Sequence, residues 1–94
     1  MTDTTTGGTI TVHYWASARA EAGVGEDRLE VDGPISLAEV RERAVALHPG
    51  TRLADVLKAC STLVGDEPVG RADPEQVRIR PGLSVEFLPP FAGG

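Results

Sequence analysis

Apolar and polar residues alternate strictly over residues 9–15, near the start of the chain. One face of this segment carries Ile10, Val12 and Tyr14, and the other carries Thr9, Thr11 and His13. Side chains of a strand point alternately to its two faces, and the segment is rich in β-branched and aromatic residues, so it predicts a half-buried strand. Residues 28–31 alternate in the same way before the turn Asp32-Gly33-Pro34, which predicts a second strand.

Two other segments have helical patterns. Residues 16–22 are rich in alanine and stop at Gly23, which predicts a short helix with a glycine at its C-terminal end. Ser36 and Glu39 have the spacing of a capping box, and the apolar positions over residues 37–47 share one helical face. This helix must end before Pro49-Gly50. The pattern over residues 51–58 leaves open whether a further helical turn forms there.

The second half of the chain contains several short strand patterns. Residues 60–64 predict a strand that turns at Gly65-Asp66-Glu67 into a short return, and residues 83–87 predict a clear final strand. The order strand, strand, helix and further strands does not alternate as a doubly wound sheet requires. We therefore expect an α+β fold in which one main helix packs on one face of a small mixed sheet. With the first and last strands side by side, this is the β-grasp, or ubiquitin-like, arrangement.

Length and charge limit what such a domain can do. The chain has 94 residues and a net charge of -5, and Lys58 is its only lysine, so nucleic-acid binding is not expected. One cysteine and two histidines give neither a disulfide nor the paired ligand spacing of a zinc site. No apolar stretch has the length of a membrane span, and the start lacks the features of a secretory signal. A cytoplasmic protein fits these features.

The last six residues are the most informative part of the sequence. Pro89 and Pro90 lack backbone N–H donors, so the sheet stops there and the following residues are held extended. Phe91 and Ala92 precede Gly93 and Gly94, which make the narrowest thread that a polypeptide can form. We expect three regions: a disordered leader at 1–8, one domain at 9–88 and a flexible tail at 89–94. The tail can enter a slot in a partner protein and present its terminal carboxylate there.

The other reactive residue types favour structural roles. His13 falls on the polar face of the first strand, and His48 is placed to complement the end of a helix. Cys60 begins a predicted strand and is expected to be buried and inert, while Tyr14 and Trp15 are expected in the core. Where the tail leaves the domain, Phe87, Leu88 and Phe91 form an apolar group, so we expect them to dock on a partner.

Two segments resemble a known family. Residues 12–23, VHYWASARAEAG, resemble the first strand and helical turn of the small, sulfur-carrying subunit of molybdopterin synthase (the MoaD type). Residues 87–94, FLPPFAGG, are similar to the ending of that family, and the resemblance runs from about Ile10 to Gly94. The Gly-Gly ending alone is shared with carriers of thiamine and cysteine biosynthesis and with ubiquitin. The opening segment favours the molybdenum pathway.

The resemblance implies a role for Gly94 rather than a catalytic site. In the family, a partner enzyme adenylates the terminal glycine with ATP, and a sulfur donor then converts it to a thiocarboxylate. The tail, with Gly93 and residues 89–92 as the threading segment, delivers sulfur to a cyclic pyranopterin phosphate inside the large synthase subunit. We therefore expect no cofactor on this chain and a complex with two copies of each subunit. The alternatives are a carrier for thiamine or cysteine biosynthesis and a ubiquitin-like protein modifier.

Overall fold

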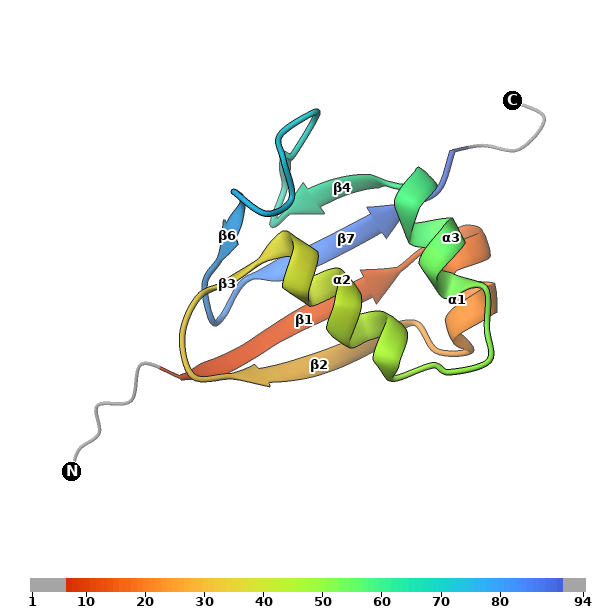
Figure 1. Ribbon diagram of the computed structural model, residues 1–94, viewed down its shortest axis with the longest axis horizontal. Helices are drawn as coiled ribbons and strands as arrows, with labels where there is room; N and C mark the ends of the chain where they lie inside the picture. Colours follow the sequence, from red (N-terminus) through yellow and green to blue (C-terminus); the bar gives the residue numbers. More distant parts are fainter. Residues whose placement is uncertain (1–6, 91–94) are drawn as a thin grey trace.

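The computed structural model describes residues 7–90, which form two sheets and three helices (Figure 1). The larger, five-stranded sheet has the order β2-β1-β7-β4-β5, and a two-stranded sheet pairs β3 with β6. The strands are β1 (Gly8–Tyr14), β2 (Glu26–Val31), β3 (Ile35–Ser36), β4 (Ser61–Val64), β5 (Glu67–Pro68), β6 (Arg78–Ile79) and β7 (Ser84–Leu88). The helices are α1 (Ala16–Ala22), α2 (Leu37–Ala46) and α3 (Leu53–Ala59).

The first and last strands lie side by side, as the β-grasp expectation requires. β1 pairs in parallel with β7, and both are flanked by antiparallel neighbours, β2 on one side and β4 on the other. The α+β fold class is thereby confirmed. Figure 1 shows β1 and β7 running in the same direction toward the end of the sheet where α1 and α3 lie. The main chain therefore leaves β7 at that end.

The core lies between the five-stranded sheet and α2, which crosses one face of the sheet (Figure 1). Alternate side chains of the strands point into this layer and pack there against the buried side chains of the helices. The fully buried large side chains are Ile10, Val12, Leu37, Val40, Leu53, Leu57, Ile79, Val85 and Phe87. The opposite face of β2, β1 and β7 carries polar side chains, which are half-buried or exposed.

Helix boundaries follow local chemistry. The Ser36 hydroxyl accepts a hydrogen bond of 3.0 Å from the backbone N–H of Glu39, which begins α2 as the capping box predicts. α1 ends at Gly23, whose φ of 79° is the left-handed conformation that glycine adopts without strain. The uncertain segment after Gly50 forms a true helix, α3, because Leu53 and Leu57 are buried on one face.

The start of the domain differs from the sequence expectation. Gly8, which was expected in the leader, is the first residue of β1 and is paired with Val31 of β2. The strand ladder extends to this residue because backbone hydrogen bonding does not depend on a side chain. Gly7 belongs to no strand, and residues 1–6 lie outside the described residues.

A buried polar group joins β1, β2 and the loop after α2. The Tyr14 hydroxyl donates a hydrogen bond of 2.8 Å to Asp27 Oδ2, and His48 Nε2 lies 2.5 Å from the same oxygen. The rings of Tyr14 and His48 meet edge to face. His48, in the loop after α2, thus pairs with the carboxylate of Asp27 on β2. Burial raises the pKa of the Tyr14 hydroxyl far above its usual range, and the hydrogen bond to Asp27 and the charge of Asp27 raise it further.

Candidate functional site

The candidate site is the point where the chain leaves the central strand β7. Leu88, the last residue of β7, is half-buried and opposite Ser61 of β4. Pro89 is half-buried and Pro90 is exposed, and neither has an N–H to continue the ladder. The sheet therefore ends where the sequence predicts. Phe91, Ala92, Gly93 and Gly94 lie outside the described residues.

One predicted docking residue is in the wrong place. The side chain of Phe87 is fully buried, and its ring stacks on Tyr14 with 6.5 Å between the ring centroids. The alternation of β7 explains this, because Val85 and Phe87 point to the helices while Glu86 and Leu88 point to the other face. Phe87 is a core residue and supplies no contact surface to a partner. The docking role predicted for Leu88 and Phe91 stays a prediction.

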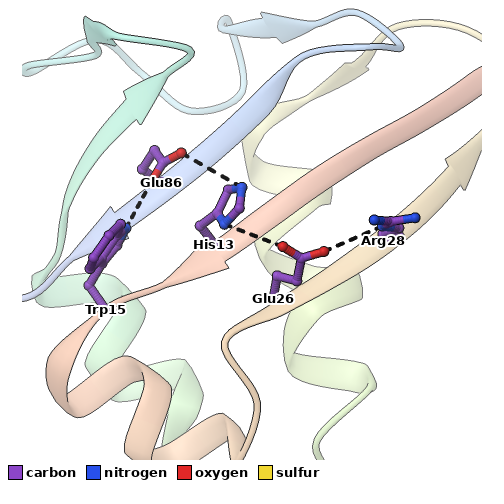
Figure 2. A network of polar contacts seen from close by, with 5 residues as sticks. All are labelled: His13, Trp15, Glu26, Arg28 and Glu86. Carbon is purple, nitrogen blue, oxygen red and sulfur yellow. Dashed lines mark hydrogen bonds and ion pairs between the residues drawn. The ribbon is translucent and has the colours of Figure 1, made fainter.

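A row of polar side chains crosses three strands on the open face beside this exit (Figure 2). His13 of β1 is opposite Glu26 of β2 and Glu86 of β7 in the strand register. His13 Nδ1 lies 3.6 Å from Glu26, and His13 Nε2 lies 3.9 Å from Glu86. Arg28 approaches Glu26 at 3.4 Å from the next outward position of β2. Two carboxylates thus flank one imidazole, and only Arg28 brings a permanent positive charge.

Trp15 completes this row and was not predicted to do so. Its indole Nε1 donates a hydrogen bond of 2.8 Å to Glu86, and its backbone N–H donates one of 3.2 Å to the carbonyl of Phe87. The side chain is 51% exposed, so Trp15 is a surface residue and not the core residue expected from its size. The signal was present in the alternation: position 15 falls on the same face as His13, not on that of Tyr14.

The described residues show neither a metal-binding cluster nor a thiol with a lowered pKa near the polar row. Among residues 7–90, no group of three His, Cys, Asp or Glu side chains is placed to hold a metal ion. Cys60 lies between α3 and β4, where burial raises the pKa of its thiol to about 11 although nearby Arg41 lowers it. The thiol is therefore protonated at neutral pH.

No helix in the described part of the chain is long and apolar enough to cross a membrane.

Sequence comparison identifies the family. The chain matches the ThiS family over residues 12–94. It is 34% identical over 86 residues to the molybdopterin synthase sulfur carrier subunit of Aspergillus niger, covering 92% of this chain and 94% of that one. It is 32% identical over 85 residues to the subunit of the same name from Chlamydomonas reinhardtii, covering 90% of this chain and 98% of that one. The chain therefore belongs to the ThiS family, and its resemblance to the sulfur carrier subunits of molybdopterin synthase is confirmed.

Solved structures share the fold. SAMP1 from Haloferax volcanii superimposes with a TM-score of 0.73 at 21% identity, covering 93% of this chain and all of that one. A chain of the complex of subunits 1 and 2 of molybdopterin-converting factor from Helicobacter pylori superimposes with a TM-score of 0.62 at 19% identity. That match covers 92% of this chain and 99% of the other. Each likeness covers more than nine tenths of this chain.

Proposed function

We propose that this chain is the sulfur carrier subunit of a molybdopterin synthase, with Gly94 as the residue that holds the sulfur. The observation that carries the proposal is the end of β7. The central strand stops at Pro89-Pro90, and the remaining four residues finish in Gly93-Gly94. Relatives at 32–34% identity that bear the carrier name support the same role.

The chemistry requires outside activation of the terminal carboxylate. A carboxylate is ionised at pH 7 and is a poor electrophile. In the proposed cycle, an activating enzyme uses ATP to form the adenylate of Gly94 and releases pyrophosphate. A sulfur donor then displaces AMP and leaves a thiocarboxylate, which gives its sulfur to cyclic pyranopterin monophosphate. In this cycle the partners supply the ATP and the acid and base groups, and the chain acts as a carrier and not as an enzyme on its own.

The transfer of sulfur to cyclic pyranopterin monophosphate takes place inside a partner, the large catalytic subunit. Six residues reach at most about 20 Å when fully extended, so residues 89–94 are long enough to enter a pocket from the surface of the domain. A solved complex of the two subunits of a molybdopterin-converting factor contains a chain of this fold, which supports a two-subunit assembly. We further propose two copies of each subunit and a cytoplasmic location, where the single cysteine stays reduced.

The competing functions are less well supported. A carrier for thiamine or cysteine biosynthesis has the same Gly-Gly ending, but the curated relatives at 32–34% identity bear the molybdopterin synthase name. A small archaeal modifier protein 1 is named among the structural neighbours, but that likeness rests on the fold at 17% identity. The modifier function is therefore not favoured.

Two measurements on protein purified from its own cells test the proposal. Intact mass spectrometry should find part of the chain with the mass gain of an oxygen-to-sulfur exchange at its C-terminus. Affinity capture of the tagged chain, with the tag at the N-terminus, should recover a large molybdopterin synthase subunit in equal amount. A ladder of lysine conjugates would instead indicate a modifier. Capture of thiamine or cysteine pathway enzymes would move the chain to another carrier class.

A further inference from the structure

Within residues 7–90, no strand pairs with the outer edge of β2. This strand is the first in the sheet order β2-β1-β7-β4-β5 and pairs only with β1. The Tyr14 N–H donates a hydrogen bond of 2.9 Å to the carbonyl of Gly25, just before β2. Inward and outward backbone groups alternate along an antiparallel pair, so the N–H and C=O groups of Glu26, Arg28 and Glu30 point away from β1. An extended segment of another chain can join such an edge.

Arg43 of α2 closes one end of this edge. Its guanidinium donates a hydrogen bond of 2.8 Å to the carbonyl of Glu30. The outward backbone groups of Glu26 and Arg28 have no hydrogen-bond partner in the described part of the chain. A joining strand can therefore form hydrogen bonds at these two residues without displacing a side chain.

The side chains at the free part of the edge carry opposite charges. Glu26 and Arg28 both point to the open face of the sheet, where they contact each other at 3.4 Å (Figure 2). Their side chains are 42% and 73% exposed, so a partner strand can reach both. Like charges directly opposite each other destabilise a strand pair, and opposite charges stabilise it. A strand that joins here should therefore place a cation opposite Glu26 and an anion opposite Arg28.

A second copy of β2 meets this requirement when it runs antiparallel with Asp27 on the two-fold axis. Glu26 of each copy then lies opposite Arg28 of the other, and each of these pairs exchanges two backbone hydrogen bonds. The Asp27 carboxylate accepts a hydrogen bond from the Tyr14 hydroxyl of its own copy, on the helix side of the sheet. The pairing therefore uses the free backbone groups and sets opposite charges against each other.

Other registers of the same pairing are less favourable. With Glu26 or Arg28 on the axis, that residue would lie opposite its own copy, so like charges would meet. With Leu29 on the axis, Arg28 would lie opposite Glu30, but this pair would need the Glu30 carbonyl that Arg43 occupies. Charge and hydrogen bonding thus select the same register.

We propose that the chain self-associates through β2 into a symmetric dimer, in which the two five-stranded sheets form one continuous sheet. The contact is made by Glu26 and Arg28 of each copy, at the opposite edge of the sheet from β5. It does not involve the C-terminal tail, so the inference is independent of the proposed function. Because two residues of each copy form the pairing, the dimer is weak and exchanges with the monomer.

Sedimentation equilibrium of the full chain, over a wide range of protein concentration, tests the dimer. A reducing agent excludes a disulfide through Cys60. We expect the mean mass to rise with concentration from that of a monomer toward that of a dimer. The amides of Glu26 and Arg28 should gain protection from hydrogen exchange over the same range, while that of Leu29, which faces β1, is protected throughout. A chain that stays monomeric, or that gains protection only elsewhere, would overturn the proposal.

Charge-reversal variants test the register. Arg28→Glu and Glu26→Arg should each weaken self-association at least about tenfold, because both cross-strand pairs become like-charged. Mixing the two variants should restore association, since each pair of the mixed dimer again joins opposite charges. Arg71→Glu and Glu67→Arg are the matched controls, with the same changes of net charge at exposed positions outside β2, and should leave association unchanged. Equal weakening by a variant and its control, or a mixture that associates no better than either variant alone, would contradict the proposed pairing.

Discussion

The indole of Trp15 donates a hydrogen bond of 2.8 Å to Glu86, which ties the residue before α1 to the last strand. The backbone of Trp15 bonds in addition to the carbonyl of Phe87, two residues before Pro89. β1 and its continuation therefore set the direction in which the chain leaves the sheet. With its Nε1 donor engaged, the exposed indole ring remains available for apolar contact with a partner beside the tail.

Replacing Trp15 with alanine should weaken the complex with the large subunit by at least about 1 kcal/mol. An exposed tryptophan next to the entering tail is the residue type that dominates interface energies. The melting temperature of the isolated chain should change little, because half of the side chain is already in water. Leu47→Ala is the matched control, since Leu47 is also 51% exposed but follows α2. Equal dissociation constants for the two variants in calorimetry would remove Trp15 from the interface.

Deleting Gly94, or adding one residue after it, should abolish thiocarboxylate formation. The activating enzyme must reach the terminal carboxylate, and either change moves that group by one residue. Thermal unfolding should be unchanged, because the last strand already ends at Leu88. Intact mass after incubation with activating enzyme, ATP and sulfur donor measures the product. A truncated chain that still gains the sulfur mass would contradict the role of Gly94.

The two phenylalanines at the end of the chain should behave differently. Phe87→Ala should destabilise the fold by about 3–5 kcal/mol, because it removes a fully buried ring. Phe91→Ala should leave the melting temperature unchanged and weaken the partner complex by at least about 1 kcal/mol. Chemical denaturation measures the first effect and calorimetry the second. A Phe87→Ala chain that keeps its stability but binds the partner more weakly would show that Phe87 belongs to the docking surface.

Much of this fold follows from patterns that act locally. The capping box at Ser36 and the alternation of residues 9–14 specify α2 and β1, because a cap and a strand face depend on neighbouring residues alone. The parallel pairing of β1 with β7 was expected only from the fold class. The register of this pairing cannot be predicted from the sequence, since hydrogen bonds between backbone groups do not depend on the side chains.

The polar row beside the exit could not be predicted for that reason. Glu26, His13 and Glu86 are far apart in sequence and meet only through the register of three strands. The positions of Trp15 and Phe87 were available from the alternation, but the size of Trp15 and the place of Phe87 near the end of the chain gave the wrong expectations. A large aromatic side chain such as that of Trp15 suggests the core, but its position in the alternation is on the outward face. An aromatic residue near the chain end such as Phe87 suggests the surface, but its position in the alternation is on the inward face.

Alkaline pH should destabilise the chain through Tyr14. The folded state holds the Tyr14 pKa far above the ordinary value near 10, because the ring is buried and its hydroxyl donates to Asp27. Below about pH 10 both states keep the proton, so this contribution to stability is fully present. Above it the unfolded chain loses the proton first, and the free energy of unfolding falls by at most about 1.4 kcal/mol per pH unit for this group.

Tyr14→Phe isolates this effect, because it keeps the ring that stacks on Phe87 and removes the group that titrates. Urea unfolding from pH 8 to pH 11 should show a shallower loss of stability for Tyr14→Phe than for the wild type. Cys60 also contributes a loss of stability at alkaline pH, since its pKa in the folded chain is raised to about 11. The comparison is therefore made in a Cys60→Ala background. Parallel curves for the two proteins would mean that the Tyr14 hydroxyl ionises alike in the folded and unfolded chain.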